Sequence, residues 1–147
     1  TRGIVPATAY PPPPSKGHGK QFVSGALSAH SGGIVVLTDG SGGAAGSDVR
    51  LRRCGWAYIQ MHLPHVPGGR FSHAGVLEGP VQTFTRAELI AFAEALRGTP
   101  NGLNLTVVSD SAYVVNEFAK LQGGVFPMKH RDIWAAIRRH MLNRPNR

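Results

Sequence analysis

Cysteine is almost absent from this sequence. Its one thiol among 147 residues is that of Cys54, so the chain cannot form an internal disulfide or a cysteine-rich zinc site. This composition is typical of intracellular proteins, and we predict a location in the cytoplasm or the nucleus. Long apolar runs are also missing, because no stretch approaches the roughly 20 residues that a membrane-spanning helix needs. We therefore expect no membrane insertion.

Acidic residues are scarce as well. The chain has eight Asp and Glu against sixteen Lys and Arg, which gives a formal net charge of +8. A surplus of this size attracts polyanions at long range, so nucleic acid is the expected partner. The alternative is that the basic residues only keep the protein soluble. In either case, the position of each of the few carboxylates becomes informative.

The composition changes along the chain. Residues 1–30 contain a proline run from Pro11 to Pro14, several Gly and Ser residues and no sustained apolar periodicity, which indicates an extended, flexible segment. The periodic apolar patterns follow, and a chain of 147 residues has room for one core but hardly two. We therefore predict a flexible N-terminal segment, 1–30, and a single folded domain, 31–147.

Apolar patterns in the second part predict both strands and helices. Unbroken apolar runs or alternation predict four strands, which lie near 33–38, 55–62, 70–77 and 103–109. Helical spacing of apolar residues predicts three helices, which begin near Thr85, Ser111 and Asp132. The expected order is three strands, a helix, a strand and two helices. The first three strands should form an antiparallel meander.

Three of the acidic residues lie where these predicted elements meet. Asp39 and Asp110 each follow an apolar run, and Glu88 lies in the first turn of a predicted helix. Each carboxylate also has an ordinary structural interpretation. Asp39 fits a common turn dipeptide with Gly40, and Asp110 fits a helix cap. Glu88 fits a capping box that begins at Thr85.

The three positions together favour a metal site. The carboxyl ends of neighbouring parallel strands meet at one edge of a sheet, so Asp39 and Asp110 should lie together, with Glu88 on the helix that crosses between them. Converging carboxylates without nearby Lys or Arg repel one another unless a dication neutralises them. Mg²⁺ suits such oxygen ligands and accepts substrate phosphate oxygens, with Mn²⁺ as the alternative. Two such ions can activate a water and stabilise a leaving oxygen.

Four motifs have an order and spacing that resemble those of type 1 ribonuclease H. They are Thr38-Asp39-Gly40-Ser41-Gly42-Gly43, Gly55-Trp56-Ala57-Tyr58-Ile59, Thr85-Arg86-Ala87-Glu88-Leu89 and Ser109-Asp110-Ser111-Ala112-Tyr113-Val114-Val115. The resemblance implies an α/β fold in which a mixed sheet, made of three antiparallel strands and a parallel strand, is flanked by helices. It also implies metal-dependent hydrolysis of the RNA strand of RNA/DNA hybrids, which leaves 5′-phosphate and 3′-hydroxyl ends.

The resemblance also assigns roles to individual residues. Asp39, Glu88 and Asp110 match three of the family's four metal-binding carboxylates and are the expected catalytic residues. The expected substrate-binding residues are Gly40, Ser41, Gly42, Thr83, Thr85, Arg86 and Ser111. The glycine-rich backbone at 40–42 lets amides approach a sugar-phosphate chain, with a plain turn as the alternative. Thr83 matches a threonine that holds a DNA-strand phosphate, and Arg86 either steadies another phosphate or forms a surface ion pair.

The sequence departs from the family pattern in two respects. The family's fourth carboxylate, fifth strand and His-bearing loop are expected beyond Arg147, so the last strand and helix are missing from this chain and its metal site is expected to be incomplete. Asp132 is not the missing ligand, because we expect it to cap the helix that follows it. Where the family often has asparagine and glutamine near the metal ligands, this sequence has Phe84, Thr85 and Ala112.

These expectations leave several hypotheses open. The leading one is an endonuclease that acts on RNA/DNA hybrids by a two-metal mechanism. One alternative is a catalytically inactive module that binds nucleic acid or another partner, which the incomplete carboxylate set favours. A second is an integrase-like relative that cuts duplex DNA. Without a fifth strand, the strand at 103–109 should form an open edge that self-associates or accepts a complementing chain.

Overall fold

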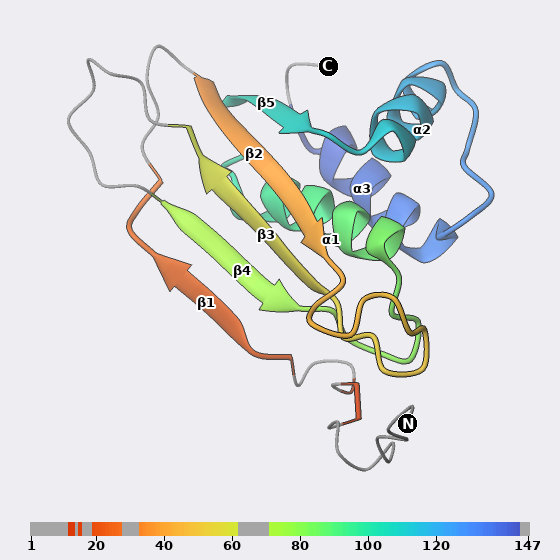
Figure 1. The fold of residues 1–147 in the computed structure, drawn as a ribbon. Coiled ribbons are helices and arrows are strands. Elements are labelled where there is room, and N and C mark those ends of the chain that lie inside the picture. The colour runs from red at the N-terminus through yellow and green to blue at the C-terminus, as the bar shows by residue number, and fades with distance from the viewer. Residues whose placement is uncertain (1–11, 14, 16–18, 28–32, 62–70, 145–147) are drawn as a thin grey trace, which may run out of the picture.

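The fold is a five-stranded sheet with three helices (Figure 1). The computed structural model describes residues 12–13, 15, 19–27, 33–61 and 71–144. The strands are β1 (Gln21–Ser24), β2 (Gly33–Ser41), β3 (Gly55–Gln60), β4 (Ser72–Val76) and β5 (Asn104–Ser109). The helices are α1 (Phe84–Gly98), α2 (Ala112–Gln122) and α3 (Arg131–Leu142).

The strands lie in the order β1-β4-β3-β2-β5. β2 pairs in parallel with β5, and the other neighbouring strands are antiparallel. The predicted mixed α/β sheet is confirmed, with β2, β3 and β4 as its antiparallel meander and β5 as the parallel strand. β5 forms one edge of the sheet, and within the described residues only β2 pairs with it (Figure 1).

Strand β1 falls in the segment 1–30, for which the sequence predicts no regular structure. All four of its residues are exposed, and they pair with β4 from Gln21 opposite Gly75 to Ser24 opposite Ser72. A strand whose side chains all remain in water has no apolar alternation, so its sequence gives no periodic signal. Much of this segment lies outside the described residues, and the boundary between a flexible segment and a domain stays a prediction.

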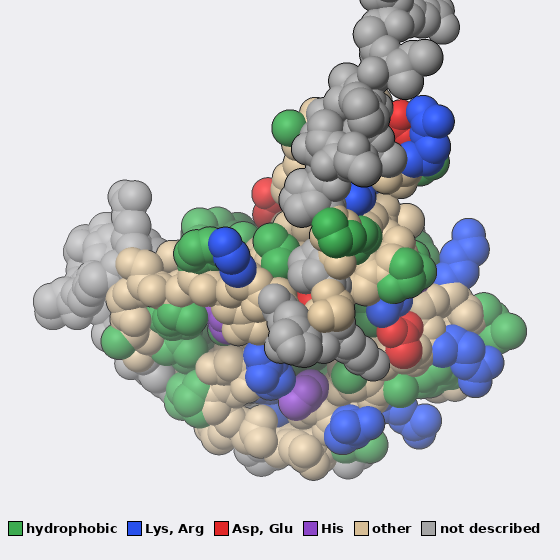
Figure 2. All heavy atoms as spheres, turned by 90° about the horizontal axis from the view of Figure 1, so that it is seen from below, with side chains coloured by type: hydrophobic (Ala, Val, Ile, Leu, Met, Phe, Trp, Pro, Cys, Tyr) green, Lys and Arg blue, Asp and Glu red, His purple; other side chains and the backbone are tan. Residues whose placement is uncertain are grey.

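The surface of the molecule is rich in basic side chains. On the face seen in Figure 2, Lys and Arg side chains are spread over the molecule and Asp and Glu side chains are fewer. This agrees with the formal net charge of +8. Among the described helices, none has the length and apolar character that crossing a bilayer requires.

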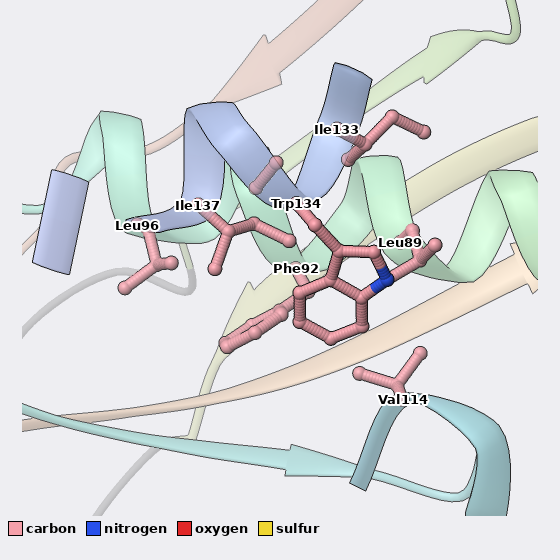
Figure 3. Packing of buried hydrophobic residues seen from close by; sticks show 8 residues of the cluster. Leu89, Phe92, Leu96, Val114, Ile133, Trp134 and Ile137 are labelled. Atoms are coloured by element: carbon pink, nitrogen blue, oxygen red, sulfur yellow. The ribbon is translucent and has the colours of Figure 1, made fainter. Parts of the chain in front are cut away.

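Helix α1 is the centre of the core. Its side facing the sheet carries the small residues Ala91 and Ala95, which are fully buried against β2 and β3. Its opposite side packs on α2 and α3 through larger side chains. The buried residues of this second cluster, most of which Figure 3 labels, are Leu89, Phe92, Ala93, Leu96, Val114, Ile133, Trp134 and Ile137. Because α1 is buried on both sides, its first turns have a fixed position relative to β2.

The connection that leads into α1 is held by Gln82, a buried polar residue. Its amide nitrogen donates hydrogen bonds of 2.8 Å to the carbonyl oxygens of Leu77 and Gly79. Its side-chain oxygen accepts a hydrogen bond of 2.7 Å from the backbone N–H of Cys54. All three bonds satisfy the buried amide and tie the start of α1 to the start of β3.

Candidate metal centre

Asp39 and Asp110 lie at the same level of two neighbouring parallel strands. In the ladder between β2 and β5, the last paired residues are Thr38 and Ser109, and the two aspartates come directly after them. The buried hydroxyl of Thr38 donates to the carbonyl oxygen of Val108 at 3.5 Å, which joins the strands just before this point. Parallel pairing therefore brings the two carboxylates together, as the sequence predicts.

Glu88 reaches the same place from the second turn of α1. Its Oε1 accepts a hydrogen bond of 2.9 Å from the backbone N–H of Gly40. One ligand atom from each of Asp39, Glu88 and Asp110 lies within 4.8 Å of the other two. The structure therefore brings together all three carboxylates that the sequence predicts as metal ligands.

Neither aspartate has the structural role that its sequence context allowed. Asp39 lies inside β2, opposite Ala57 of β3, so the turn interpretation is wrong. The N-cap of α2 is Ser111, whose hydroxyl oxygen accepts from the N–H of Val114 at 3.4 Å, so Asp110 does not cap this helix. Both carboxylates are exposed and accessible to a ligand.

The capping box that was the structural alternative for Glu88 is also wrong. The N-cap is Thr83 rather than Thr85, and its hydroxyl oxygen accepts from the N–H of Arg86 at 3.2 Å. Because the helix begins earlier than the pattern indicates, Glu88 lies beyond the reach of the N-cap residue. Its carboxylate points to β2 and bonds Gly40 instead.

The surroundings of Glu88 oppose its negative charge. Burial, and to a lesser degree the charges of Asp39 and Asp110, raise the pKa of Glu88 from 4.5 to about 7, although the Gly40 N–H lowers it. Its second oxygen, Oε2, is buried and has no hydrogen-bond partner among the described residues. A buried, unpaired carboxylate oxygen costs free energy, and a dication would both satisfy it and neutralise the set. The residues present therefore fit a divalent metal ion.

The other acidic residues are engaged elsewhere. Of the eight Asp and Glu in the chain, four form ion pairs with Arg or Lys: Asp48, Glu94, Glu117 and Asp132. Glu78 accepts a hydrogen bond of 3.0 Å from the N–H of Gly19. The remaining three acidic residues are those of the candidate centre, and in the described part of the chain no Lys or Arg forms an ion pair with them. Among the described residues, these three carboxylates are therefore an acidic cluster without an ion-pair partner, in a protein of net positive charge.

The glycines at positions 40 and 42 allow α1 to pack closely against the end of β2. A Cβ added to Gly40 would lie 2.6 Å from the backbone nitrogen of Glu88, and one added to Gly42 would collide with the ring of Phe84. The N–H of Gly40 donates its hydrogen bond to Glu88, so it does not serve as the predicted contact to a substrate. Ser41 is exposed, and its hydroxyl oxygen accepts from a backbone N–H at 3.2 Å. The plain-turn alternative is wrong, because Gly40 and Ser41 are the last two residues of β2 and Gly42 follows them directly.

Two helices begin beside the carboxylates. Thr83 and Thr85 lie at the N-terminus of α1, and Ser111 lies at that of α2, directly after Asp110. Helix N-termini carry unpaired N–H groups and a partial positive charge, which favour phosphate and other anions. Oxygen ligands for a cation and helix ends for an anion are therefore adjacent in this site.

Arg86 forms the ion pair that the sequence left as an alternative to phosphate binding. Its guanidinium donates to both carboxylate oxygens of Asp132, at 3.2 and 2.5 Å. Asp132 lies in the first turn of α3, whose N-cap is His130, so the prediction that Asp132 caps this helix is wrong. Arg86 holds the pKa of the Asp132 carboxyl below its usual range. The pair links α1 to α3 at the end of α1 that carries the candidate centre.

Comparisons with known proteins agree with this geometry. The ribonuclease H (RNase H) family model matches residues 31–144, a span that includes all three carboxylates. Among solved structures, the chain is similar to a foamy viral protease-reverse transcriptase in complex with dsDNA, with 22% sequence identity, a TM-score of 0.56 and coverage of 76% of each chain. This likeness supports the fold. A search of curated proteins gave no match. The chain therefore belongs to the ribonuclease H family and carries the domain of a ribonuclease H-type enzyme.

Proposed function

We propose that this chain hydrolyses the RNA strand of RNA/DNA hybrids, with divalent metal held by Asp39, Glu88 and Asp110. Membership of the ribonuclease H family supports nuclease activity on such hybrids. The observation that carries the proposal is the convergence of three carboxylates, from β2, from α1 and from the residue after β5, with one ligand atom of each within 4.8 Å of the others. An all-oxygen ligand set of this kind favours Mg²⁺, with Mn²⁺ as a substitute.

The metal and the protein have separate parts in the proposed reaction. When bound, two such ions would activate the attacking water and stabilise the leaving 3′-oxygen. Asp39 and Asp110 are exposed at the strand ends, where a metal ion that they hold would also be accessible to an oxygen of the scissile phosphate. Glu88 is fixed by the Gly40 N–H, so its position does not depend on substrate. This fixed geometry is the protein's contribution to orienting the phosphate for in-line attack.

Hydroxyl groups at the two helix starts are proposed to hold the substrate backbone. The oxygens of Thr83 and Ser111 accept backbone N–H bonds, which leaves each hydroxyl proton for donation to a phosphate. Thr85 in the first turn of α1 and Ser41 at the end of β2 are proposed to contact sugars, where a 2′-hydroxyl distinguishes RNA from DNA. Arg86 is tied to Asp132, and we assign it a supporting role instead of a phosphate contact.

A nucleic-acid-binding module without catalysis is the second candidate. All eight acidic residues lie in the described part of the chain, and the cluster contains three of them instead of the four that the family uses. Three carboxylates are enough to bind a metal ion, but two ions would then share fewer protein ligands. The two candidates differ in turnover and not in binding, so a cleavage assay separates them.

The test is cleavage of a hybrid labelled on its RNA strand, in the presence of Mg²⁺ or Mn²⁺. We expect products with 5′-phosphate ends, and loss of cleavage in Asp39→Asn and in Asp110→Asn. Asp48→Asn is the matched control, because this aspartate is ion-paired with Arg50 away from the cluster. Tight hybrid binding without cleavage would support the inactive module. Cleavage of duplex DNA but not of hybrid would support an integrase-like enzyme.

A further inference from the structure

Phe84 is an aromatic residue that stays open to solvent beside the candidate centre. It is the first residue of α1, and 45% of its surface is exposed. The end of its ring lies against Gly42 and Gly46, where the absence of side chains makes room for it; a Cβ on Gly46 would lie 3.2 Å from the ring Cζ. Gly42 and Gly46 therefore contact the end of the Phe84 ring, while about half of the residue remains accessible to solvent.

Arg52 fixes the ring from one side. Its guanidinium carbon lies 4.7 Å from the centre of the Phe84 ring, over one face. The Nε of Arg52 donates a hydrogen bond of 2.6 Å to the carbonyl oxygen of Gly46, so the guanidinium is itself held by the loop after β2. Neither the loop at the ring end nor Arg52 covers the opposite face, which we take as the open face of the ring.

This open face lies close to the three carboxylates. Phe84 precedes Glu88 by four residues, a rise of about 6 Å, on the same side of α1. The glycine that it covers, Gly42, lies two residues beyond Gly40, just past the end of β2, so the two are at most about 7 Å apart along the chain. A nucleotide whose phosphate is bound at the carboxylates therefore has its neighbouring base or sugar within reach of the ring.

We propose that Phe84, supported by Arg52, is a specificity-determining residue that stacks on an unstacked base next to the scissile phosphate. This inference rests on the proposed function. Aromatic side chains bind splayed or single-stranded bases by stacking, with little dependence on sequence, because every base has a π-face. The Arg52 guanidinium adds a positive charge that attracts the backbone of the same strand.

The substrate class follows from the cost of exposing a base. In a fully paired hybrid each base is stacked between its neighbours, and extrusion is least costly where the base is mismatched or already single-stranded. The preferred substrate is therefore a hybrid with a mismatched or terminal base beside the bond that is cleaved. Hydrogen-bonding side chains at this position would instead read base edges or 2′-hydroxyls in a regular duplex.

The test compares two hybrids that differ in one base pair next to a single cleavage site, one paired and one mismatched. Phe84→Leu removes the aromatic face but keeps an apolar side chain, and the paired hybrid serves as the control for general effects of the substitution. We expect Phe84→Leu to raise KM for the mismatched hybrid about tenfold or more with kcat unchanged, since loss of one base stack has this size. The KM of Phe84→Leu for the paired hybrid should stay close to that of the parent chain.

Binding gives a second readout that does not depend on turnover. With 2-aminopurine at the mismatched position, stacking on Phe84 should change the fluorescence on binding, and Phe84→Leu should abolish that change. Equal KM values and equal fluorescence changes for Phe84→Leu and the parent chain would overturn the inference and leave the proposed nuclease intact. A fluorescence change lost in Phe84→Leu, in a parent chain that cleaves nothing, would support stacking and contradict the nuclease. Absence of both binding and cleavage would overturn both.

Discussion

Gly40 sets the distance between β2 and α1 at the candidate centre. A methyl group there would meet backbone atoms of α1 at 2.6 to 3.0 Å, and backbone cannot move aside as a flexible side chain can. We expect Gly40→Ala to lower the free energy of unfolding by about 1–3 kcal/mol, the usual cost of overpacking. Because the helix carrying Glu88 must shift, the variant should also bind divalent metal more weakly.

The matched control for this change is Gly102→Ala. A Cβ at Gly102 meets no atom within 4 Å, so its stability in urea denaturation should stay close to that of the parent chain. If both alanine variants unfolded at the same urea concentration as the parent, the close approach at Gly40 would have no energetic meaning.

Glu88 should make the stability of the metal-free protein depend on pH. Its pKa is about 7 in the folded protein against 4.5 ordinarily, so between these values the folded chain holds a proton that the unfolded chain has released. Stability should therefore fall as pH rises from about 4.5 to about 7. In Glu88→Gln this part of the decrease should disappear, which urea denaturation at several pH values with a chelator present would measure.

Asp48→Asn provides the contrast in the same experiment. Arg50 lowers the pKa of Asp48 to about 2, so this carboxyl releases its proton below the window in which Glu88 titrates. The Asp48→Asn variant should retain the decrease between pH 4.5 and 7. An unchanged decrease in Glu88→Gln would show that other groups cause it.

At the residue scale, sequence predicted the ligands of the site better than the caps around it. Asp39 and Asp110 were predictable because parallel strands in register place the residues that follow them side by side. The capping assignments failed because a cap depends on which residue the helix starts from. Thr83 and Thr85 both satisfy the local pattern, and packing of α1 against the sheet decides between them.

At the scale of elements, Arg144 closes the C-terminal end of α1 from beyond α3. Its buried guanidinium donates to the carbonyl oxygens of Leu96, Thr99, Pro100 and Leu103, at 2.8 to 3.3 Å. A cation at this position also complements the negative end of the helix. Arg144→Ala leaves buried carbonyls unpaired, and we expect it to lower the free energy of unfolding by roughly 2–3 kcal/mol in urea denaturation.

Arg139→Ala is the corresponding control on the same part of the chain. Arg139 is exposed on α3, and such surface substitutions usually change stability by less than about 0.5 kcal/mol. Similar losses in the two variants would mean that removal of positive charge, and not the carbonyl cluster, destabilises the protein.

The elements that bury one face were predictable from the sequence, whereas β1, whose residues are all exposed, was not. Apolar runs or helical spacing of apolar residues predict β2, β5 and α1, because each of these elements packs side chains into the core. β1 adds to the sheet chiefly through backbone pairing with β4, with one side-chain hydrogen bond of 3.1 Å between Gln21 and His73, and its side chains remain exposed. Backbone pairing of this kind leaves no mark on side-chain pattern, so only the three-dimensional structure shows it.

At the scale of the whole molecule, the free edge of β5 is a candidate contact surface. Within the described residues β5 pairs on one side only, and Val108 on this strand is 43% exposed. An open apolar edge can pair with another chain, so we expect concentration-dependent self-association in sedimentation experiments. Val108→Lys should weaken it, because charge on an edge strand opposes pairing.

Val49→Lys is the control for that substitution. Val49 is 72% exposed in the loop after β2, so lysine there adds the same charge away from the sheet edge. A chain that stays monomeric at every concentration, or that is affected equally by both lysines, would contradict association through β5.

The metal centre formed by Asp39, Glu88 and Asp110 is tested most directly by locating the site at which a divalent ion binds. Mn²⁺ is paramagnetic and broadens the NMR signals of nuclei near it, so a titration of the parent chain locates the ion. We expect the amide signals of Gly40 and Ser111 to broaden first, and Asp39→Asn to abolish this effect. Broadening that begins at the ion-paired acids, such as Asp48 or Glu117, or that persists unchanged in Asp39→Asn, would contradict a metal centre formed by the three carboxylates.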